Sequence, residues 1–265
     1  PEQAQRDIRL FSGRCRQYIF ISSASAYAKP MPYPVLTEST ALKNPYWRYS
    51  REKAACEDVL MRAWREDNFP VTIVRPSHTY CERSVPVAMH GRCGSFAVIE
   101  RIRTGRKVII PGDGTTWWTT THSRDFARGF AGLMGNPHAV GEAVHITGDE
   151  SLTWNQIHQC IASALGVELR AVHIASETLA ALCDDYVGAL LGDKSNSVLF
   201  DNAKLKRLVP GFTATIRYDQ GVREALDYIY AHPELQKPDP EFDAWCDEVI
   251  ERYESAVAQL PKMAR

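Results

Sequence analysis

Two short apolar segments, separated by one long helical segment, constrain the fold of this chain more than any other feature. Residues 17–21 and residues 70–75 each have the length and apolar character of a strand buried in a parallel sheet. Residues 45–67 lie between them and have helical periodicity, with Asn44 and Pro45 as a favourable helix start. This strand–helix–strand order predicts two parallel strands that are neighbours in one sheet.

The rest of the chain continues to alternate between helical and strand-like segments. Residues 76–94 have neither pattern and are predicted to form a loop. The alternation predicts an α/β protein in which the later segments form a smaller lobe beside the first sheet. We expect helices over residues 2–13, 95–104, 123–134, 153–166 and 241–260, and strands over residues 107–110, 143–147 and 168–173.

Charge and hydropathy argue against several classes of partner. The 265 residues include 31 Lys and Arg and 32 Asp and Glu, interspersed to a net charge of −1. The sequence therefore has no basic block that would suit nucleic acid or an anionic membrane surface. Its apolar runs are all shorter than the roughly 18 residues that cross a bilayer. We expect neither a nucleic-acid partner nor a membrane partner.

The cysteines and histidines show no spacing typical of disulfide frameworks or metal sites. The seven cysteines are odd in number and scattered, without a CxxC pair, which predicts reduced thiols in a cytoplasmic protein. The eight histidines form no HxH or HExxH pattern, so we expect no metal site. A serine hydrolase is also disfavoured, because no G-x-S-x-G segment surrounds the serines that follow the first strand.

The helical segment at residues 45–67 carries Tyr49 and Lys53 one turn apart, on one face. An ammonium near a phenol favours the phenolate, so such a tyrosine is a better acid or base near neutral pH. By itself the pair is also typical of a solvated helix face. Ser22 and Ser23 follow the first strand, at the sheet edge where open parallel sheets bind ligands. The serines would otherwise only cap loop backbone, but here a hydroxyl, a phenol and an ammonium can converge.

Three segments, in this order and spacing, resemble one known family. Residues 20–27, 49–53 and 74–80 are similar to the extended short-chain dehydrogenase/reductases, and more narrowly to the NAD-dependent epimerase/dehydratase group. Residues 109–114 and 144–166 resemble the later region of that group. The resemblance implies an α/β fold with a partial Rossmann-like parallel sheet, flanking helices and a smaller C-terminal α/β substrate lobe.

The resemblance also implies roles for individual residues. Tyr49 would be the acid or base that exchanges a proton with a substrate hydroxyl or carbonyl. Lys53 would hold the nicotinamide ribose of NAD or NADP and favour the Tyr49 phenolate. Ser23 would hydrogen-bond the same substrate oxygen, with Ser25 assisting, and Ser22 would lie with Tyr49 and Lys53 at the cofactor.

Four further residues are candidates near the cofactor and substrate. Pro76 would lie against the nicotinamide, and His78 would either contact substrate or hydrogen-bond its own loop. Trp117 and Trp118 would either stack on substrate or pack inside the lobe. The small-molecule substrate would be a sugar or a sugar nucleotide.

Two departures from the family pattern restrict the reaction. Dehydratases of the group carry an acidic pair where Ala24 and Ser25 stand here, so dehydration by that route is disfavoured. Sugar-nucleotide enzymes commonly carry an Arg, which binds the pyrophosphate, shortly after the turn at residues 112–114. Residues 115–119 contain no Arg, so a sugar-nucleotide substrate is left open.

The Gly-rich turn by which this family binds the dinucleotide does not follow any predicted strand. Residues 1–90 would therefore be the C-terminal half of a Rossmann-like domain whose N-terminal half is absent. Residues 91–265 would form the substrate lobe and C-terminal helices, partly interleaved with that half. We expect weak or absent NAD binding, and an open sheet edge at residues 17–21.

These expectations lead to two functions of different classes. The first is an NAD(P)-dependent epimerase or reductase that acts on a sugar-like hydroxyl or carbonyl and is impaired in cofactor binding by truncation. The alternative is a non-catalytic interaction or scaffold protein derived from the same fold. In both cases we expect a homodimer through the open edge or through the helices at residues 2–13 and 45–67.

Overall fold

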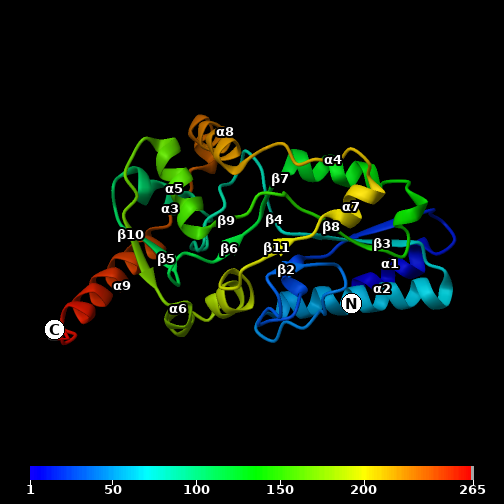
Figure 1. The fold of residues 1–265 in the computed structure, drawn as a ribbon, viewed down its shortest axis with the longest axis horizontal. Coiled ribbons are helices and arrows are strands. Elements are labelled where there is room, and N and C mark those ends of the chain that lie inside the picture. The colour runs from blue at the N-terminus through cyan, green and yellow to red at the C-terminus, as the bar shows by residue number, and fades with distance from the viewer. Residues whose placement is uncertain (264–265) are drawn as a thin grey trace.

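The first part of the chain is built on a three-stranded parallel sheet (Figure 1). The computed structural model describes residues 1–263. The strands are β1 (Tyr18–Ile21), β3 (Val71–Pro76) and β8 (Ala143–Ile146), in the spatial order β1-β3-β8. Tyr18 lies opposite Val71, and Ile73 lies opposite Ala143. The prediction that residues 17–21 and 70–75 form parallel neighbours is confirmed.

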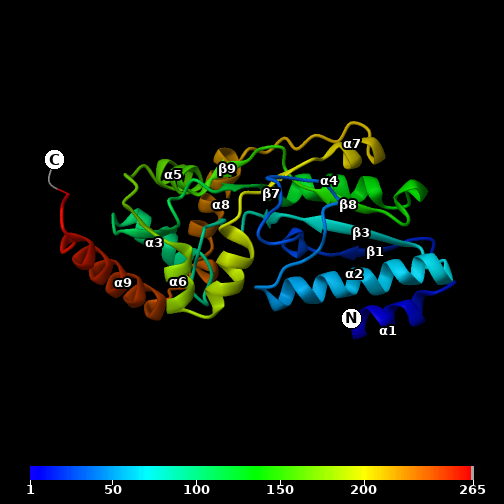
Figure 2. The same ribbon diagram turned by 60° about the horizontal axis from the view of Figure 1, so that its bottom comes forward.

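Helices cover both faces of this sheet (Figure 2). One face carries α1 (Glu2–Phe11) and α2 (Arg48–Asp67), and the other carries α4 (Ser123–Leu133) and α7 (Ala203–Leu208). Leu60, Phe69 and Ile73 are fully buried between the sheet and α2. Val144 and Leu133 are fully buried on the opposite face. Burial on both faces explains why apolar residues of β3 point to either side of the sheet, with Ile73 on the α2 face and Val74 on the α4 face.

β1 is an edge strand, since it pairs with β3 alone within residues 1–263. Its last residue, Ile21, is 39% exposed. The backbone groups of Tyr18 and Ser22 face β3, because their N–H groups donate to Pro70 O at 2.8 Å and Val74 O at 2.7 Å. The groups of Ile21 therefore face away from β3. The open edge expected at residues 17–21 is present in this part of the chain.

α2 begins three residues later than its start signal predicts, at Arg48 instead of Pro45. Asn44 does not cap the helix itself, because its Oδ1 accepts from Tyr46 N–H at 3.1 Å and Trp47 N–H at 3.2 Å. These bonds fold a turn immediately before the helix, and extended Trp47 takes the cap position. The prediction of a helix from residue 45 is wrong at this end.

The second lobe packs helices around a parallel pair of strands (Figure 1). The pair is β5 (Val108–Pro111) with β10 (Ala171–Ile174), and Trp154, Ile99 and Ile110 are buried beside it. Thr153 and Gln156 form a capping box at the start of the helix Trp154–Leu165. The lobe helices are α3 (Phe96–Arg103), α5 (Trp154–Leu165), α6 (Ser176–Leu182), α8 (Tyr218–Ala231) and α9 (Pro240–Ala258).

Short strand pairs join the two parts of the fold. β4 lies inside residues 76–94, so the prediction that this segment is only a loop is wrong. The pairs are β2 (Val35–Leu36) with β11 (Leu199–Phe200), β4 (His78–Tyr80) with β7 (Thr120–His122), and β6 (Trp117–Trp118) with β9 (Leu152–Thr153). Single-turn helices are η1 (Ala24–Ala26), η2 (Pro137–Ala139) and η4 (Pro233–Leu235), and η3 (Val187–Lys194) is a π-helix.

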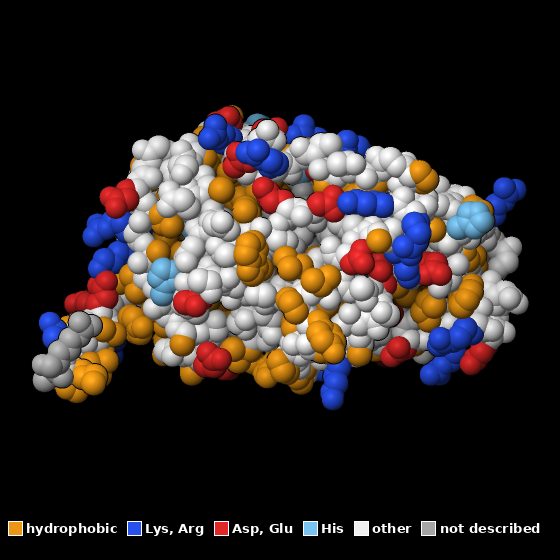
Figure 3. All heavy atoms as spheres, viewed as in Figure 1, with side chains coloured by type: hydrophobic (Ala, Val, Ile, Leu, Met, Phe, Trp, Pro, Cys, Tyr) orange, Lys and Arg blue, Asp and Glu red, His pale blue; other side chains and the backbone are white. Residues whose placement is uncertain are grey.

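The surface mixes charges of both signs. On the face drawn in Figure 3, Lys and Arg side chains lie beside Asp and Glu side chains over the whole length of the molecule. Among the described helices, none combines the length and the apolar character that crossing a membrane requires.

Candidate functional site

The loop after β1 and the start of α2 are joined by a chain of hydroxyl groups. Ser23 caps η1, because its Oγ accepts from Ser25 N–H at 3.2 Å. Ser23 Oγ also lies 2.8 Å from Ser25 Oγ. Ser50, on α2, donates its own hydroxyl proton to Ser25 Oγ at 2.8 Å. The three hydroxyls link the carboxyl end of β1 to the residue that follows Tyr49.

Tyr49 lies in the first turn of α2 and is 43% exposed. Lys53 follows one turn later, with its Nζ 5.7 Å from the centroid of the Tyr49 ring and 4.9 Å from that of Phe20. Lys53 Nζ also donates to Ile21 O at 2.7 Å. The helix therefore presents the phenol and the ammonium on one face, beside the carboxyl end of β1.

A cleft of about 380 Å³ opens at the carboxyl ends of β1 and β3. This is the edge at which open parallel sheets bind ligands. Most of the residues predicted for the site meet here, although they come from separate segments of the chain. The lining residues are Ser23, Ala24, Ser25, Trp47, Tyr49, Pro76, Ser77, His78, His90, Trp118, Asp193, Lys194, Val198 and Phe200.

Three of the predicted residues lie outside the lining of this cleft. Ser22 is 2% exposed, and its Oγ has no hydrogen-bond partner among the described residues. Lys53 lies behind Tyr49, bonded to the Ile21 carbonyl. Trp117 is 44% exposed on β6, where it pairs with Thr153 on the far side of the lobe core.

His78 and Trp118 hold each other in the wall of the cleft. Trp118 Nε1 donates to His78 Nδ1 at 3.3 Å, and the Trp118 ring stacks on Trp154 at 5.2 Å between centroids. Burial, together with the positive charges of Lys194 and His90, lowers the pKa of His78 to about 3. His78 is therefore neutral. Because its Nδ1 accepts the hydrogen bond from Trp118, the ring hydrogen is on Nε2. Trp118 therefore packs inside the lobe and also lines the cleft, while its stacking on substrate stays a prediction.

Sequence reasoning missed the side of the cleft that η3 supplies. Asp193 and Lys194 end this π-helix and line the cleft opposite Tyr49. Burial raises the pKa of Asp193 to about 6, although the charges of Lys29 and Lys194 lower it. Burial lowers the pKa of Lys194. The sequence signal that could have identified them is an acidic residue directly followed by a basic one at the end of an apolar segment. That segment has no clear helical or strand periodicity.

Close packing fixes η3 against the loop and the start of α2. Asn44 Nδ2 donates to Ser25 O at 2.7 Å and to Gly192 O at 2.6 Å. A Cβ on Gly188 would lie 2.4 Å from the Trp47 ring, so only glycine allows this approach. These contacts hold the part of η3 that directly precedes Asp193.

The residues present fit one end of a nicotinamide dinucleotide better than the other. Tyr49, Lys53 and Pro76 lie together at the carboxyl end of β1 and β3, and the buried Ser22 Oγ lacks a partner there. Within residues 1–263, no strand leads through a Gly-rich turn into a helix, which is the arrangement that binds the pyrophosphate. The described residues thus supply groups for the nicotinamide end alone.

Comparison with known sequences gives the family. Residues 8–147, more than half of the chain, match the family described as NAD dependent epimerase/dehydratase. The 2'-dehydrokanamycin reductase of Streptomyces kanamyceticus is 26% identical over 196 residues, which are 73% of this chain and 54% of that protein. The chloroplast stem-loop binding protein of 41 kDa b of Arabidopsis thaliana is 27% identical over 58% of this chain and 37% of that protein. The chain thus spans about half, or less, of these relatives.

Solved structures share the fold. UDP-glucuronic acid 4-epimerase from Bacillus cereus, in complex with UDP-glucuronic acid and NAD, superposes with a TM-score of 0.69 at 19% identity. The superposition covers 86% of this chain and 66% of that one. The sheet, the strand-end cleft and the match over residues 8–147 agree. This chain belongs to the NAD dependent epimerase/dehydratase family.

Proposed function

We propose that the chain carries the proton-transfer and substrate-binding part of an NAD(P)-dependent reductase or epimerase that acts on a sugar-like hydroxyl or carbonyl. The observation that carries the proposal is the cleft, in which Tyr49, Ser23 and His78 face one volume of about 380 Å³. Membership of the family and the names of its relatives, a reductase and an epimerase, support the same class of reaction.

In this proposal Tyr49 exchanges a proton with the substrate oxygen, and Ser23 hydrogen-bonds the same oxygen. The hydroxyl chain gives Ser23 its direction. If Ser50 donates to Ser25, and Ser25 donates to Ser23, the proton of Ser23 is free to point into the cleft. A donor fixed in this way stabilises the negative charge that develops on a carbonyl oxygen as it is reduced.

Lys53 lies next to Tyr49 in this proposal. Its Nζ is 5.7 Å from the centroid of the phenol ring, one helical turn further along α2. A bound nicotinamide would supply or accept the hydride, and Lys53 is placed to hold its ribose hydroxyls. Ala24 and Ser25 stand where dehydratases of the group carry an acidic pair, so these two positions supply no carboxylate for the elimination of water.

The activity is tested with the protein, NADH or NADPH, and a panel of keto-sugars, with cofactor absorbance as the readout. Tyr49→Phe should lower kcat at least a hundredfold, because it removes the proton donor. Tyr33→Phe is the matched control, since Tyr33 is 74% exposed and outside the cleft, and it should keep full activity. Equal activity of the two variants would sink the proposal.

We further propose that residues 1–265 alone bind NAD weakly, because the described part holds groups for the nicotinamide end only. Titration calorimetry of this chain should give a dissociation constant no tighter than about 100 μM, a range that a few contacts can supply. Submicromolar binding would show this reasoning to be wrong. Wild-type inactivity with every sugar, together with retained partner binding, would favour the scaffold alternative.

A further inference from the structure

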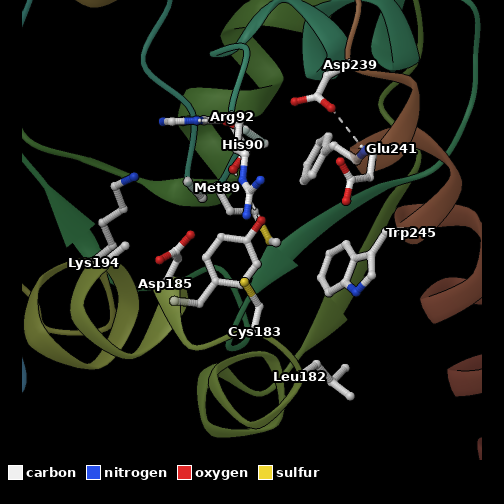
Figure 4. A pocket seen from close by; sticks show the side chains of 15 residues that line it. Met89, His90, Arg92, Leu182, Cys183, Asp185, Lys194, Asp239, Glu241 and Trp245 are labelled. Atoms are coloured by element: carbon white, nitrogen blue, oxygen red, sulfur yellow. Dashed lines mark hydrogen bonds between the residues drawn. The ribbon is translucent and has the colours of Figure 1, made fainter.

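A second pocket of about 400 Å³ lies beside the catalytic cleft, in the later lobe (Figure 4). Three segments that are far apart in the sequence form its walls: residues 88–92, the α6–η3 segment and the start of α9. Neither the family's motifs nor the resemblance assigned anything to these walls. Its lining is predominantly apolar, and includes Met89, Leu182, Tyr186, Ala189, Phe242 and Trp245.

The pocket adjoins the cleft, because His90 and Lys194 line both volumes. Tyr186 holds the His90 backbone at this boundary, because its hydroxyl donates to His90 O at 3.2 Å. A ligand that occupied both volumes would pass His90 and Lys194.

The walls of this pocket are closely packed. A Cβ on Gly91 would lie 2.3 Å from Asp239 Oδ2 and 2.5 Å from Phe242 Cβ, so residues 88–92 approach α9 as closely as only glycine permits. The Asp239 carboxylate links these two segments, because it accepts hydrogen bonds from Cys93 N–H at 3.0 Å and from Phe242 N–H at 3.1 Å. The walls of the pocket are therefore fixed by close packing and by hydrogen bonds.

Aromatic rings form one side of the pocket. The Tyr186 and Trp245 rings lie 5.9 Å apart between centroids, and the Phe242 ring stacks on Trp245 at 6.2 Å. Tyr186 and Phe242 are buried, while Trp245 is partly exposed to the pocket. Faces of this kind pack against flat or ring-shaped apolar surfaces.

Free polar groups surround those rings. Asp185 and Glu241 are exposed carboxylates that line the pocket, and neither makes an ion pair or a side-chain hydrogen bond within residues 1–263. The Arg92 guanidinium is equally unengaged among these residues. The pocket thus offers acceptors for hydroxyl groups, a strong donor, and an aromatic platform.

We infer that this pocket binds a second sugar ring, so that the substrate is a glycoside of at least two rings. The inference rests on the proposed function for the position of the first ring, which the cleft holds. The C–H face of the second ring would pack on Trp245 and Tyr186, and its hydroxyls would donate to Asp185 and Glu241. The acidic side chains of the lining, Asp185, Asp239 and Glu241, outnumber the basic Arg92 and Lys194, which disfavours a diphosphate in this pocket.

Titration calorimetry on the protein tests the inference with maltose, cellobiose and lactose against glucose, galactose and methyl glucoside. At least one disaccharide should bind about tenfold or more tightly than its monosaccharides, as one or two hydrogen bonds to a charged group supply. Asp185→Asn and Trp245→Ala should remove that increment and leave monosaccharide binding unchanged. Asp184→Asn and Tyr253→Ala, on neighbouring exposed positions outside the pocket, should keep it.

Two results would overturn the inference. One is a titration panel in which no disaccharide binds more tightly than its constituent monosaccharides. The other is tight binding of uridine diphosphate that Trp245→Ala abolishes, which would make the pocket a nucleotide site. Failure of the proposed function looks different: cofactor turnover is absent while the disaccharide increment persists. Because Asp185 is exposed, its variant stays informative even if Trp245→Ala fails to fold.

Discussion

Ser50 Oγ donates to Ser25 Oγ at 2.8 Å, which ties the residue after Tyr49 to the loop after β1. Ser50 is fully buried, and Ser25 is 5% exposed. The phenol that we propose as proton donor and the serine that would share its substrate oxygen are thus positioned by one buried hydrogen bond. Residues far apart in sequence are held in register by it.

Ser50→Ala tests this positioning role. The change leaves Ser25 without its donor, and the loss of one buried hydrogen bond should lower the free energy of unfolding by about 1 kcal/mol. It should also lower kcat more than it raises KM, because Ser23 loses its direction and not its contact with the cleft. Chemical denaturation and steady-state kinetics measure the two effects. Ser39→Ala, on an exposed loop, is the control, and equal kinetics of the two variants would contradict the role.

Glu57→Gln tests the buried ion pair beneath the cleft. Arg75 and Glu57 lie 2.6 Å apart, with side chains 7% and 3% exposed. Removing one charge leaves the other buried and unpaired, so the free energy of unfolding should fall by about 3–5 kcal/mol in urea denaturation. Glu52→Gln removes an exposed pair with Arg48 and should change it by less than about 1 kcal/mol. If Glu57→Gln lowers the free energy of unfolding by less than about 1 kcal/mol, the buried pair does not stabilise the fold.

Asp193 gives the protein a pH-dependent stability of a definite sign. Its pKa is raised from 3.8 to about 6 by burial, so the folded protein holds this proton more tightly than the unfolded chain. The resulting stabilisation is present below pH 3.8 and is lost as the pH rises through about 6.

Asp193→Asn removes that ionisation while keeping the shape of the side chain. Relative to the wild type, the variant should become more stable as the pH rises from 4 to 8, in urea denaturation at each pH. Asp184→Asn, at an exposed position outside the cleft, should track the wild type throughout. A stability difference between Asp193→Asn and the wild type that does not vary with pH would refute the assignment.

The open edge of β1 predicts self-association of residues 1–265. Within residues 1–263 the outer edge of β1 has no partner strand, although Lys53 bonds the Ile21 carbonyl. This edge and the exposed Ile21 side chain form a surface that a second copy can cover. Sedimentation velocity at micromolar concentration should therefore show a dimer, and Ile21→Lys should shift it towards monomer. Leu260→Lys, a change at a 65% exposed position just after α9, should leave the dimer intact. A monodisperse wild-type monomer would rule this out.

The βαβ unit was predictable because its two strands are short and mostly apolar and a helical segment of suitable length lies between them. The start of α2 was not predictable, because the Asn44 side chain hydrogen-bonds the turn before the helix and Trp47 occupies the N-cap position. Strands as short as β2 and β11 have two residues each, too few for a period to show. Their pairing is decided by the tertiary fold.

The residues of the candidate site that share one local segment were predictable, and those brought in by distant contacts were not. Tyr49 and Lys53 share a helix, so their spacing alone places them on one face. Asp193 and Lys194 come from a π-helix whose position depends on contacts with Trp47 and Asn44, more than a hundred residues away. Local sequence carries no record of such contacts, and the same holds for the pocket walls that meet at Gly91.

Asn44 has a consequence for how the cleft responds to its surroundings. Its amide uses both hydrogens and both acceptor positions, joining the loop at Ser25, the turn before α2 and η3 at Gly192. An amide does not ionise, so this three-way joint is the same at every pH, whereas Asp193 beside it changes charge. The shape of the cleft and its charge are therefore set by different residues, and one can vary without the other.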